Sequence, residues 1–344
     1  MKLDAGLGVE GDYLGNVREA ARTADDLGFA GLWTNETKHD GFLPLAIAAE
    51  ASERIELGTS VAIAFSRSPM ELAQTAWDLQ HLSNGRFILG LGTQVKAHVT
   101  RRFSMPWDRP VARLRDYILA LRAIWHSFQT DEPLRYEGEF YRHTLLTPFF
   151  DPGPIDHPQI PIYIAGVNTA LATLAGELCD GFHVHPFHSP EYLRETVEPA
   201  ISEGAKKRGR EPGEVERATS VFVITGEDEA EVEASRERIR SQIAFYASTP
   251  TYRVVLEAHG WEEVGGELGG LAREKRWDEM PKLVTDEMLG AFAIEAPPDE
   301  IGGALRERYT GLVDRVALYL SFVPGERDAF WRTVIEGTIS GPLQ

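Results

Sequence analysis

The segment spanning residues 54–94 constrains the fold more than any other part of this chain. It contains two continuous apolar runs, IELGTSVAIAF and RFILGLG, separated by a helical pattern. Runs of this kind are typical of strands buried on both faces of a parallel sheet. Polar and glycine residues gather directly after each run, at 66–69 and 90–93. In a (β/α)8 barrel the carboxyl ends of the strands carry the active site, so the segment predicts an architecture and the edge where chemistry occurs.

The remainder of the chain repeats this alternation of apolar runs and helical patterns. Besides the two runs above, strands are predicted at 2–7, 31–36, 160–166, 180–186, 218–226 and 314–322. Eight strands with helices between them and no separating linker predict a single (β/α)8 TIM barrel domain over residues 1–344. Two stretches, about 93–158 and 248–296, exceed ordinary connections, and we interpret them as insertions on the carboxyl-terminal rim. Within the first stretch, 109–128 is a predicted amphipathic helix and 134–143 a predicted hairpin.

The charge balance restricts the classes of partner. There are 35 lysines and arginines against 53 aspartates and glutamates, a formal net charge of −18. This charge opposes binding to nucleic acid and to anionic membranes. No apolar run reaches the ~20 residues of a membrane span, and the first residues lack the order of a signal peptide. The lone Cys179 excludes an internal disulfide. The sequence therefore predicts an acidic cytoplasmic protein that acts on a small molecule.

Five segments resemble one family in their order and spacing: GFAGLWTNE, ELGTSVAIAFSRSP, GRFILGLGT, PIYIAGVN and LAGELCDGF. In this order they are similar to the bacterial luciferase-like monooxygenase superfamily. The segment FSMPWDRPVARLRDYILALRAIW is also typical of its branch of coenzyme F420-dependent oxidoreductases. The resemblance implies a luciferase-like barrel that transfers a hydride between the deazaflavin and a small organic substrate. It also implies a homodimer or homotetramer.

A flavin or deazaflavin requires a flat apolar slot for its rings and a site for one phosphate. Gly166 and Val167 precede a helix predicted to start near Asn168, and their backbone N–H groups would be presented to that phosphate. A glycine before a helix also occurs in plain turns, so Gly166 could equally serve the turn geometry. In the family the third strand contains a non-proline cis peptide against the rings, and the matching bond here is Ser60–Val61. The residues assigned to the cofactor are Ser60, Val61, Ile63, Leu91, Gly92, Thr93, Ala165, Gly166, Val167 and Asn168.

Three residues are predicted to face the substrate. Glu36 ends the second strand, where a carboxylate could polarise a substrate or exchange a proton; it could equally be an ion-pair partner. Better-known deazaflavin dehydrogenases of the superfamily carry an Asp-His pair at this place. This chain has Glu36-Thr37 instead, and its histidine follows later, at His39. His98 lies after the fourth strand, where relatives often have Asn or Glu.

Several basic residues follow the predicted strand ends and are interpreted as a local patch for an anionic cofactor tail: Arg67, Lys96, Arg101 and Arg102. Three alternatives remain open. The first is an FMN-dependent monooxygenase on the same fold, and another is a non-catalytic flavin-binding relative. The third is a metal-dependent barrel hydrolase, because His183 and His185 alternate along a predicted strand and could share an ion. No further ligands are evident, so no metal is predicted.

Overall fold

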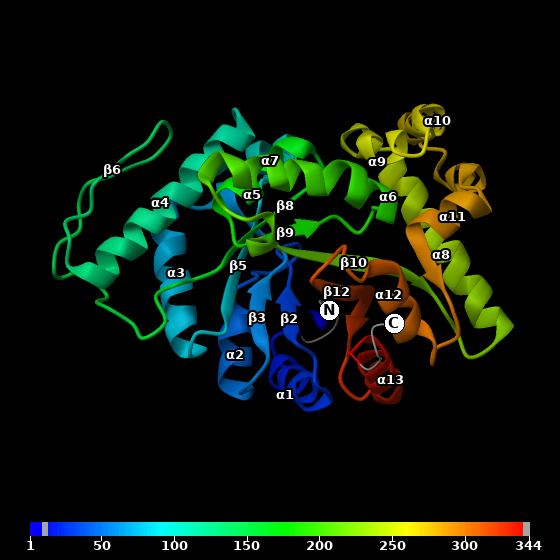
Figure 1. Ribbon diagram of the computed structural model, residues 1–344, viewed down its shortest axis with the longest axis horizontal. Helices are drawn as coiled ribbons and strands as arrows, with labels where there is room; N and C mark the ends of the chain where they lie inside the picture. The colour runs from blue at the N-terminus through cyan, green and yellow to red at the C-terminus, as the bar shows by residue number, and fades with distance from the viewer. Residues whose placement is uncertain (9–12, 340–344) are drawn as a thin grey trace.

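A computed structural model describes residues 1–8 and 13–339. Eight of the strands in these residues form a closed parallel barrel, in which β1 pairs with both β2 and β12 (Figure 1). Around the barrel they are β1 (Lys2–Leu7), β2 (Gly31–Thr34), β3 (Glu56–Thr59), β5 (Phe87–Gly92), β8 (Ile162–Gly166), β9 (Gly181–Val184), β10 (Glu216–Ile224) and β12 (Arg315–Phe322). The predicted (β/α)8 barrel is confirmed, and each predicted strand is present.

The third predicted strand is interrupted near its carboxyl end. β3 stops at Thr59, and a two-residue strand β4 (Ala62–Ile63) continues the pairing with β5. The Ser60–Val61 peptide bond between them is cis, as the resemblance implied.

The longer helices cover the outside of the barrel. They are α1 (Val17–Leu27), α2 (Leu43–Ala51), α3 (Pro69–Leu82), α4 (Pro110–Thr130), α5 (Thr169–Leu178), α7 (Glu198–Arg208), α8 (Glu229–Ala247), α12 (Ile301–Tyr309) and α13 (Asp328–Ile339). Their ends follow local sequence signals. α3 starts at Ser68-Pro69, where the Ser68 hydroxyl accepts the N–H of Glu71, and α1 stops at Gly28, which has a φ of 94°. Within the described ranges no helix is long and apolar enough to cross a membrane.

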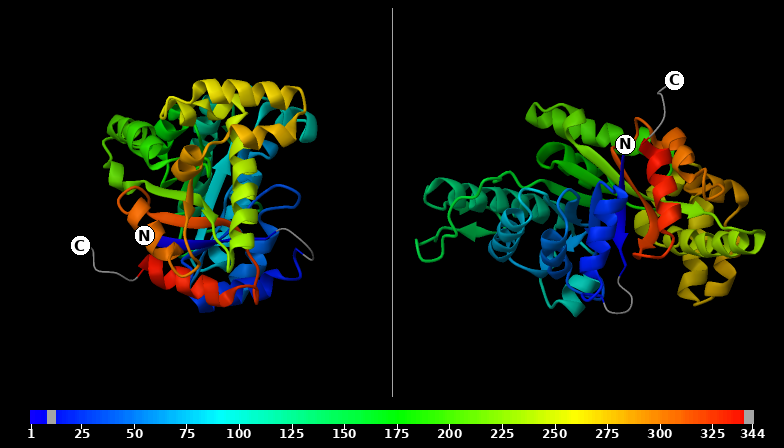
Figure 2. Two further views of the ribbon diagram at one scale, coloured as in Figure 1. Left: turned by 90° about the vertical axis from the view of Figure 1, so that its right-hand side faces the viewer. Right: turned by 90° about the horizontal axis from the view of Figure 1, so that it is seen from below.

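Two excursions leave the barrel and lie at opposite ends of its long dimension (Figures 1 and 2). The first contains the predicted hairpin, as β6 (Tyr136–Glu137) and β7 (Arg142–His143). The second contains α9 (Arg253–Glu257), α10 (Glu262–Arg273), α11 (Asp286–Phe292) and β11 (Ala293–Glu295), which pairs with β10. Shorter helical segments are η1 (Ala64–Ser66), η2 (His98–Arg102), α6 (Pro190–Tyr192), η3 (Leu193–Val197), η4 (Pro212–Glu214), η5 (Pro250–Tyr252) and η6 (Trp277–Leu283).

The structure differs from the predicted insertions in two respects. α4 lies within the range 93–158, yet it packs against α3 and α5 and is therefore one of the barrel's own helices. Only the parts before and after α4 are irregular. The range 248–296, for which no helix was predicted, is largely helical. α13 was not predicted; it packs on α12 and against β1.

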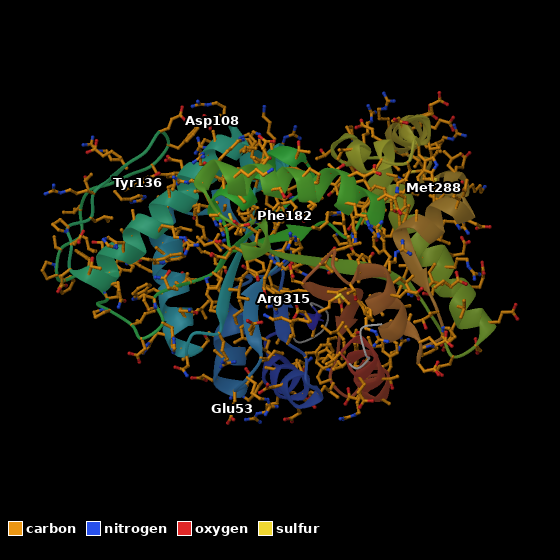
Figure 3. All side chains as sticks on the ribbon, viewed as in Figure 1. Glu53, Asp108, Tyr136, Phe182, Met288 and Arg315 are labelled. Atoms are coloured by element: carbon orange, nitrogen blue, oxygen red, sulfur yellow. The ribbon has the colours of Figure 1, made fainter. Side chains whose placement is uncertain are left out.

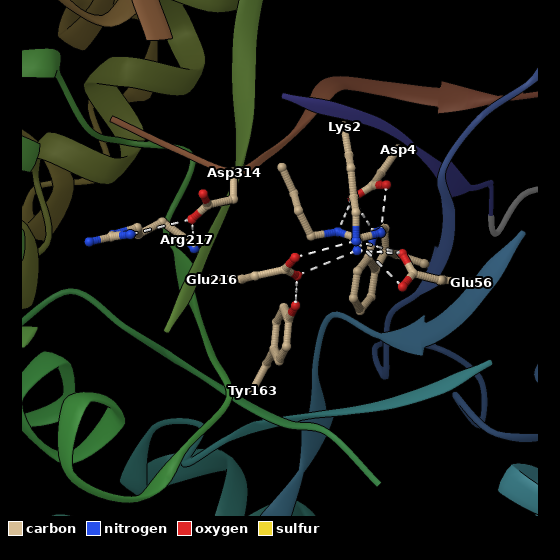
Figure 4. A network of polar contacts seen from close by, with 9 residues as sticks. Lys2, Asp4, Glu56, Tyr163, Glu216, Arg217 and Asp314 are labelled. Carbon is tan, nitrogen blue, oxygen red and sulfur yellow. Dashed lines mark hydrogen bonds and ion pairs between the residues drawn. The ribbon is translucent and has the colours of Figure 1, made fainter. Parts of the chain in front are cut away.

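A network of charged side chains fills the amino-terminal end of the barrel (Figure 4). The Arg315 guanidinium is fully buried and donates to both oxygens of Asp4, at 2.8 Å each, and to Glu56 at 2.6 Å. The Trp33 indole N–H also donates to Asp4, at 2.8 Å. Figure 3 places Arg315 among the barrel strands. This end is therefore closed by paired charges, and any ligand must enter from the other end.

Two adjacent glycines in α12 give a matched test of its packing on α13. A Cβ on Gly302 would lie 2.5 Å from the carbonyl oxygen of Val334, whereas one on Gly303 would meet nothing within 4 Å. We expect Gly302→Ala to lower the free energy of unfolding by about 1–3 kcal/mol, because backbone atoms must move apart. Gly303→Ala should raise it by up to ~1 kcal/mol, because alanine favours a helix. Urea unfolding measures both, and equal stabilities would contradict the packing described.

Candidate active site

A cavity of about 750 Å3 lies at the carboxyl ends of β2, β3, β5, β8 and β9. Ten of the predicted site residues line it: Glu36, Ser60, Val61, Ile63, Gly92, Thr93, Ala165, Gly166, Val167 and Asn168. They come from four separate strand ends, which the closed barrel brings to one edge. Its volume lies within the ~300–1,000 Å3 of typical ligand pockets. This cavity is the candidate active site.

One wall of the cavity is apolar and lies where β3, β4 and β5 meet. A Cβ on Gly92 would come within 2.6 Å of the Val61 side chain, so the absence of a side chain at Gly92 lets Val61 lie over β5. A Cβ on Gly90 would lie 1.8 Å from the Thr59 carbonyl oxygen. The Thr59 hydroxyl also donates to the Gly90 carbonyl, at 2.7 Å, and accepts its N–H, at 3.0 Å. The wall is thus held by close backbone contacts, and it offers a flat surface rather than polar groups.

The opposite part of the cavity is formed by the start of α5. The Asn168 side chain caps this helix by accepting the N–H of Leu171 at 3.0 Å, which confirms the predicted helix start. The first N–H groups of a helix have no partner within it, so those of Thr169 and Ala170 point out of its end. Gly166 is required by packing, because a Cβ there would lie 2.6 Å from the Leu171 side chain. The start of α5 has the geometry of an anion site.

Glu36 is buried at the edge of the cavity, and both of its oxygens are engaged. One accepts the backbone N–H of Ile63 at 2.6 Å and Arg67 at 2.9 Å; the other accepts Arg67 at 2.7 Å. Burial opposes the charge of Arg67, but the hydrogen bonds and charge of Glu36 outweigh it and raise the pKa of the guanidinium. Glu36 therefore fixes the loop that carries Val61 and Ile63 through its contacts.

The other two predicted catalytic residues lie outside the cavity lining. His39 is exposed and stacks on Tyr13, with ring centroids 4.8 Å apart. His98 is exposed at the start of η2. The structure does not bring either imidazole together with Glu36, and their catalytic roles stay predictions.

The predicted basic patch is only partly assembled. Lys96 lines the cavity, and the exposed Arg101 and Arg102 follow it on η2. Arg67 does not belong to this patch, because its side chain is 15% exposed and bound to Glu36. Of these cations only Lys96 lines the cavity; Arg102 donates to the carbonyl oxygen of Thr37 and lies over the Phe103 ring.

Sequence reasoning missed several aromatic residues that line the same cavity. Trp107 comes from the first excursion, and Tyr246 and Tyr252 come from the end of α8 and the segment after it. His183 and His185 line it as well. His185 accepts the N–H of Phe187 at 3.1 Å and contacts the Tyr252 hydroxyl at 3.2 Å. In the part of the chain that the structure describes, no group of three or more His, Cys, Asp or Glu residues could hold a metal ion.

A larger open groove of about 1330 Å3 lies elsewhere, between α8, α11 and α12. Its Arg236 pairs with Glu233 and Glu295, and its Arg240 pairs with Asp286. Because the groove lies away from the mouth of the barrel and these cations are neutralised, we do not assign the chemistry to it.

Comparison with known proteins identifies the family of the chain. The sequence profile of the luciferase-like monooxygenases matches residues 1–315. The chain belongs to this family. An uncharacterized protein of Mycobacterium tuberculosis is 47% identical over 316 residues, which are 92% of either chain. The 5,10-methylenetetrahydromethanopterin reductase of Methanolobus tindarius is 27% identical over 303 residues, covering 87% of this chain and 88% of the reductase.

A solved structure extends the likeness to the whole luciferase-like fold. The coenzyme F420-dependent tetrahydromethanopterin reductase of Methanopyrus kandleri superimposes with a TM-score of 0.77, over 98% of both chains. Its sequence is 22% identical, so this likeness concerns the fold alone. The family contains oxidoreductases and monooxygenases, some of which depend on F420.

Proposed function

We propose that this luciferase-like protein is a coenzyme F420-dependent oxidoreductase that transfers a hydride between the deazaflavin and a small organic substrate. The observation that carries the proposal is the cavity that joins the apolar wall of Val61, Ile63 and Gly92 to the start of α5. The reduced deazaflavin supplies a hydride, and the protein supplies position and electrostatics. The net charge of −18 supports a small molecule, rather than nucleic acid or an anionic membrane, as the partner.

The residues present fit the cofactor's chemical parts. Val61, Ile63 and Gly92 would pack the ring system, and the N–H groups at the start of α5 would hold the phosphate. Leu91, assigned to the rings from the sequence, is fully buried in the core and does not line the cavity. Lys96, which lines the cavity, and the exposed Arg101 and Arg102 that follow it in the chain suit a longer anionic tail, which F420 has and FMN lacks. That difference favours F420 over the FMN-dependent monooxygenase. Cytoplasmic location, and a homodimer or homotetramer, remain part of the proposal.

The proposal is tested by fluorescence titration of the purified protein with F420 and, in parallel, with FMN. Micromolar or tighter binding of F420, with FMN at least tenfold weaker, is the expected result. The reverse preference would move the assignment to a flavin-dependent monooxygenase. Binding of neither cofactor would overturn the proposed function and leave the fold unaffected.

The phosphate site can be tested with a single backbone N–H. Thr169 is the first residue of α5, and Asn168 before it is extended, with φ −93° and ψ 158°. Proline is tolerated as the first residue of a helix, and it favours an extended conformation in the residue before it. Thr169→Pro therefore removes one N–H without breaking the helix. We expect F420 affinity to fall about tenfold, equivalent to ~1.4 kcal/mol, with little change in stability. Fluorescence titration and thermal unfolding measure the two quantities.

Glu229→Pro is the matched control, because Glu229 is the first residue of α8 and follows the extended cap Asp228. No residue of 226–231 at the start of α8 lines the cavity, whereas 166–168 directly before Thr169 do, so this variant should bind F420 like the unmodified protein. Equal F420 affinities of the two proline variants would contradict the assignment of the phosphate to the start of α5.

A further inference from the structure

A second cavity of about 390 Å3 lies over the barrel axis, between the carboxyl ends of β1, β2, β9, β10 and β12. It adjoins the candidate cofactor cavity, because Asn35, Ser60, His183, Val184 and Pro186 line both. Its volume is at the small end of the range for ligand pockets. The proposed function leaves this axial cavity without an occupant.

His183 is the unusual group in the axial cavity. Its side chain is nearly enclosed, with the ring 4.9 Å from Trp33 and 5.3 Å from Tyr163 between centroids. Nevertheless, the structure gives neither ring nitrogen a hydrogen-bond partner among residues 1–8 and 13–339, and Nε2 is fully buried. Nε2 faces Gly90, where an added Cβ would sit 3.0 Å away, and Gly90 lines neither cavity, so a molecule in the axial cavity would meet the other ring nitrogen, Nδ1. Buried polar groups are normally satisfied, so an uncovered imidazole beside a cavity points to a ligand.

The polar side chains that surround the His183 ring already have other hydrogen-bond partners and do not bond to it. The Trp33 indole N–H and the Arg315 guanidinium both bind Asp4, and the Tyr163 hydroxyl donates to Glu216. Each of these bonds points toward the closed end of the barrel. Among these four side chains, His183 is therefore the one whose hydrogen-bonding capacity is available to a molecule at the open end of the barrel.

Electrostatics restrict the kind of molecule. Burial, together with the nearby charge of Arg315, lowers the pKa of His183 to about 3, so the ring is neutral and has one donor and one acceptor nitrogen. No lysine or arginine occurs among the described residues that line the axial cavity, and its one acid, Asp4, is paired with Arg315. An anionic ligand would find no counter-charge there, whereas an uncharged oxygen could bond to His183.

We propose that the axial cavity is the substrate site and that His183 hydrogen bonds to the oxygen of a small uncharged carbonyl compound or alcohol. Calling this molecule a substrate rests on the proposed function, but its binding in the axial cavity needs no cofactor. It makes His183 a substrate-binding residue that determines specificity against carboxylates.

The test uses cyclohexanone as a probe and the nitrogen resonances of 15N-labelled histidine as the readout, in the protein without added cofactor. The His183 signals are identified by their loss in His183→Asn. We expect cyclohexanone to shift these signals in a saturable way. Cyclohexanecarboxylate, which has a similar ring and a negative charge, should bind at least tenfold more weakly. Unchanged His183 signals with cyclohexanone, or equal binding of the carboxylate, would overturn the proposal.

Two variants separate hydrogen bonding from shape. His183→Asn keeps a donor and an acceptor and should retain cyclohexanone affinity within about threefold, whereas His183→Phe keeps a ring without either and should lose about tenfold, as for one lost hydrogen bond. Equal cyclohexanone affinity of the two variants would also overturn the proposal. If the unmodified protein did not bind F420, only the proposed function would be overturned, because the His183 signals report on cyclohexanone binding in the axial cavity independently.

Discussion

Replacement of Arg315 by methionine is expected to lower the free energy of unfolding by about 3–5 kcal/mol, because it leaves buried carboxylates without their cation. Asp4 is 3% exposed and loses two hydrogen bonds, and Glu56 loses one. The network lies inside the barrel, so relaxation toward water would require the strands to separate. Urea unfolding followed by circular dichroism measures the change.

Arg236→Met is the matched control for this prediction. Arg236 also pairs with two carboxylates, Glu233 and Glu295, but these are 57% and 47% exposed. Surface pairs contribute about 0–1 kcal/mol, so the control should lose little. A double variant, Arg315→Met with Asp4→Asn, should recover part of the loss while the amide oxygen still accepts from Trp33. Equal losses for Arg315→Met and Arg236→Met would contradict the role given to the buried network.

The barrel was predictable from the sequence because its strands are buried on both faces. Burial of this kind leaves continuous apolar runs, such as FILGLG in β5, that can be recognised without partners. α13 carried a comparable signal, with Trp331, Val334, Ile335 and Thr338 on one buried face, and was nevertheless overlooked. α4 was recognised as a helix, but the irregular segment before it hid its place in the outer ring.

The site was predictable where it depends on strand ends and unpredictable where it depends on loops. Ser60, Gly92 and Gly166 follow from topology, because parallel strands present their carboxyl ends at one edge. His39 and His98 lie in connections whose direction no periodicity determines, and neither residue lines the cavity. Tyr246 and Tyr252 enter from about 60 residues beyond β9, a long-range contact that leaves no local pattern. From the sequence, His183 was considered as a metal ligand and, in preference, as a core histidine or one at the edge of the cofactor.

The Arg67 assignment failed for a related reason. A cation after a strand end looks like a phosphate ligand in the sequence, but its partner is decided by what the fold places beside it. Here Glu36, Asp40 and Glu71 all lie within ion-pair distance of Arg67, so its charge is already balanced. The same contact bears on Glu36, for which the sequence left open both a role in polarising the substrate and a role as an ion-pair partner.

Glu36→Gln is expected to lower the free energy of unfolding by about 1.5–3 kcal/mol and F420 affinity by roughly tenfold, because charged hydrogen bonds of this kind contribute that much. The amide nitrogen of glutamine cannot accept from Arg67, so one of the two parallel bonds is lost and the guanidinium stays largely buried without its countercharge. The loop from Val61 to Ile63 then loses its anchor beside the ring slot. Thermal unfolding and fluorescence titration with F420 measure the two effects.

Glu71→Gln provides the comparison, because Glu71 also pairs with Arg67 but is 56% exposed and does not line the cavity. Its loss should cost no more than ~1 kcal/mol and leave F420 affinity unchanged. If Glu36 positions the loop, then Glu36→Gln weakens stability, cofactor affinity and turnover together. If turnover fell while stability and affinity stayed at the level of Glu71→Gln, Glu36 would instead act directly on the substrate. The two roles are therefore separated by affinity rather than by activity, since a displaced ring and a missing proton donor both reduce turnover.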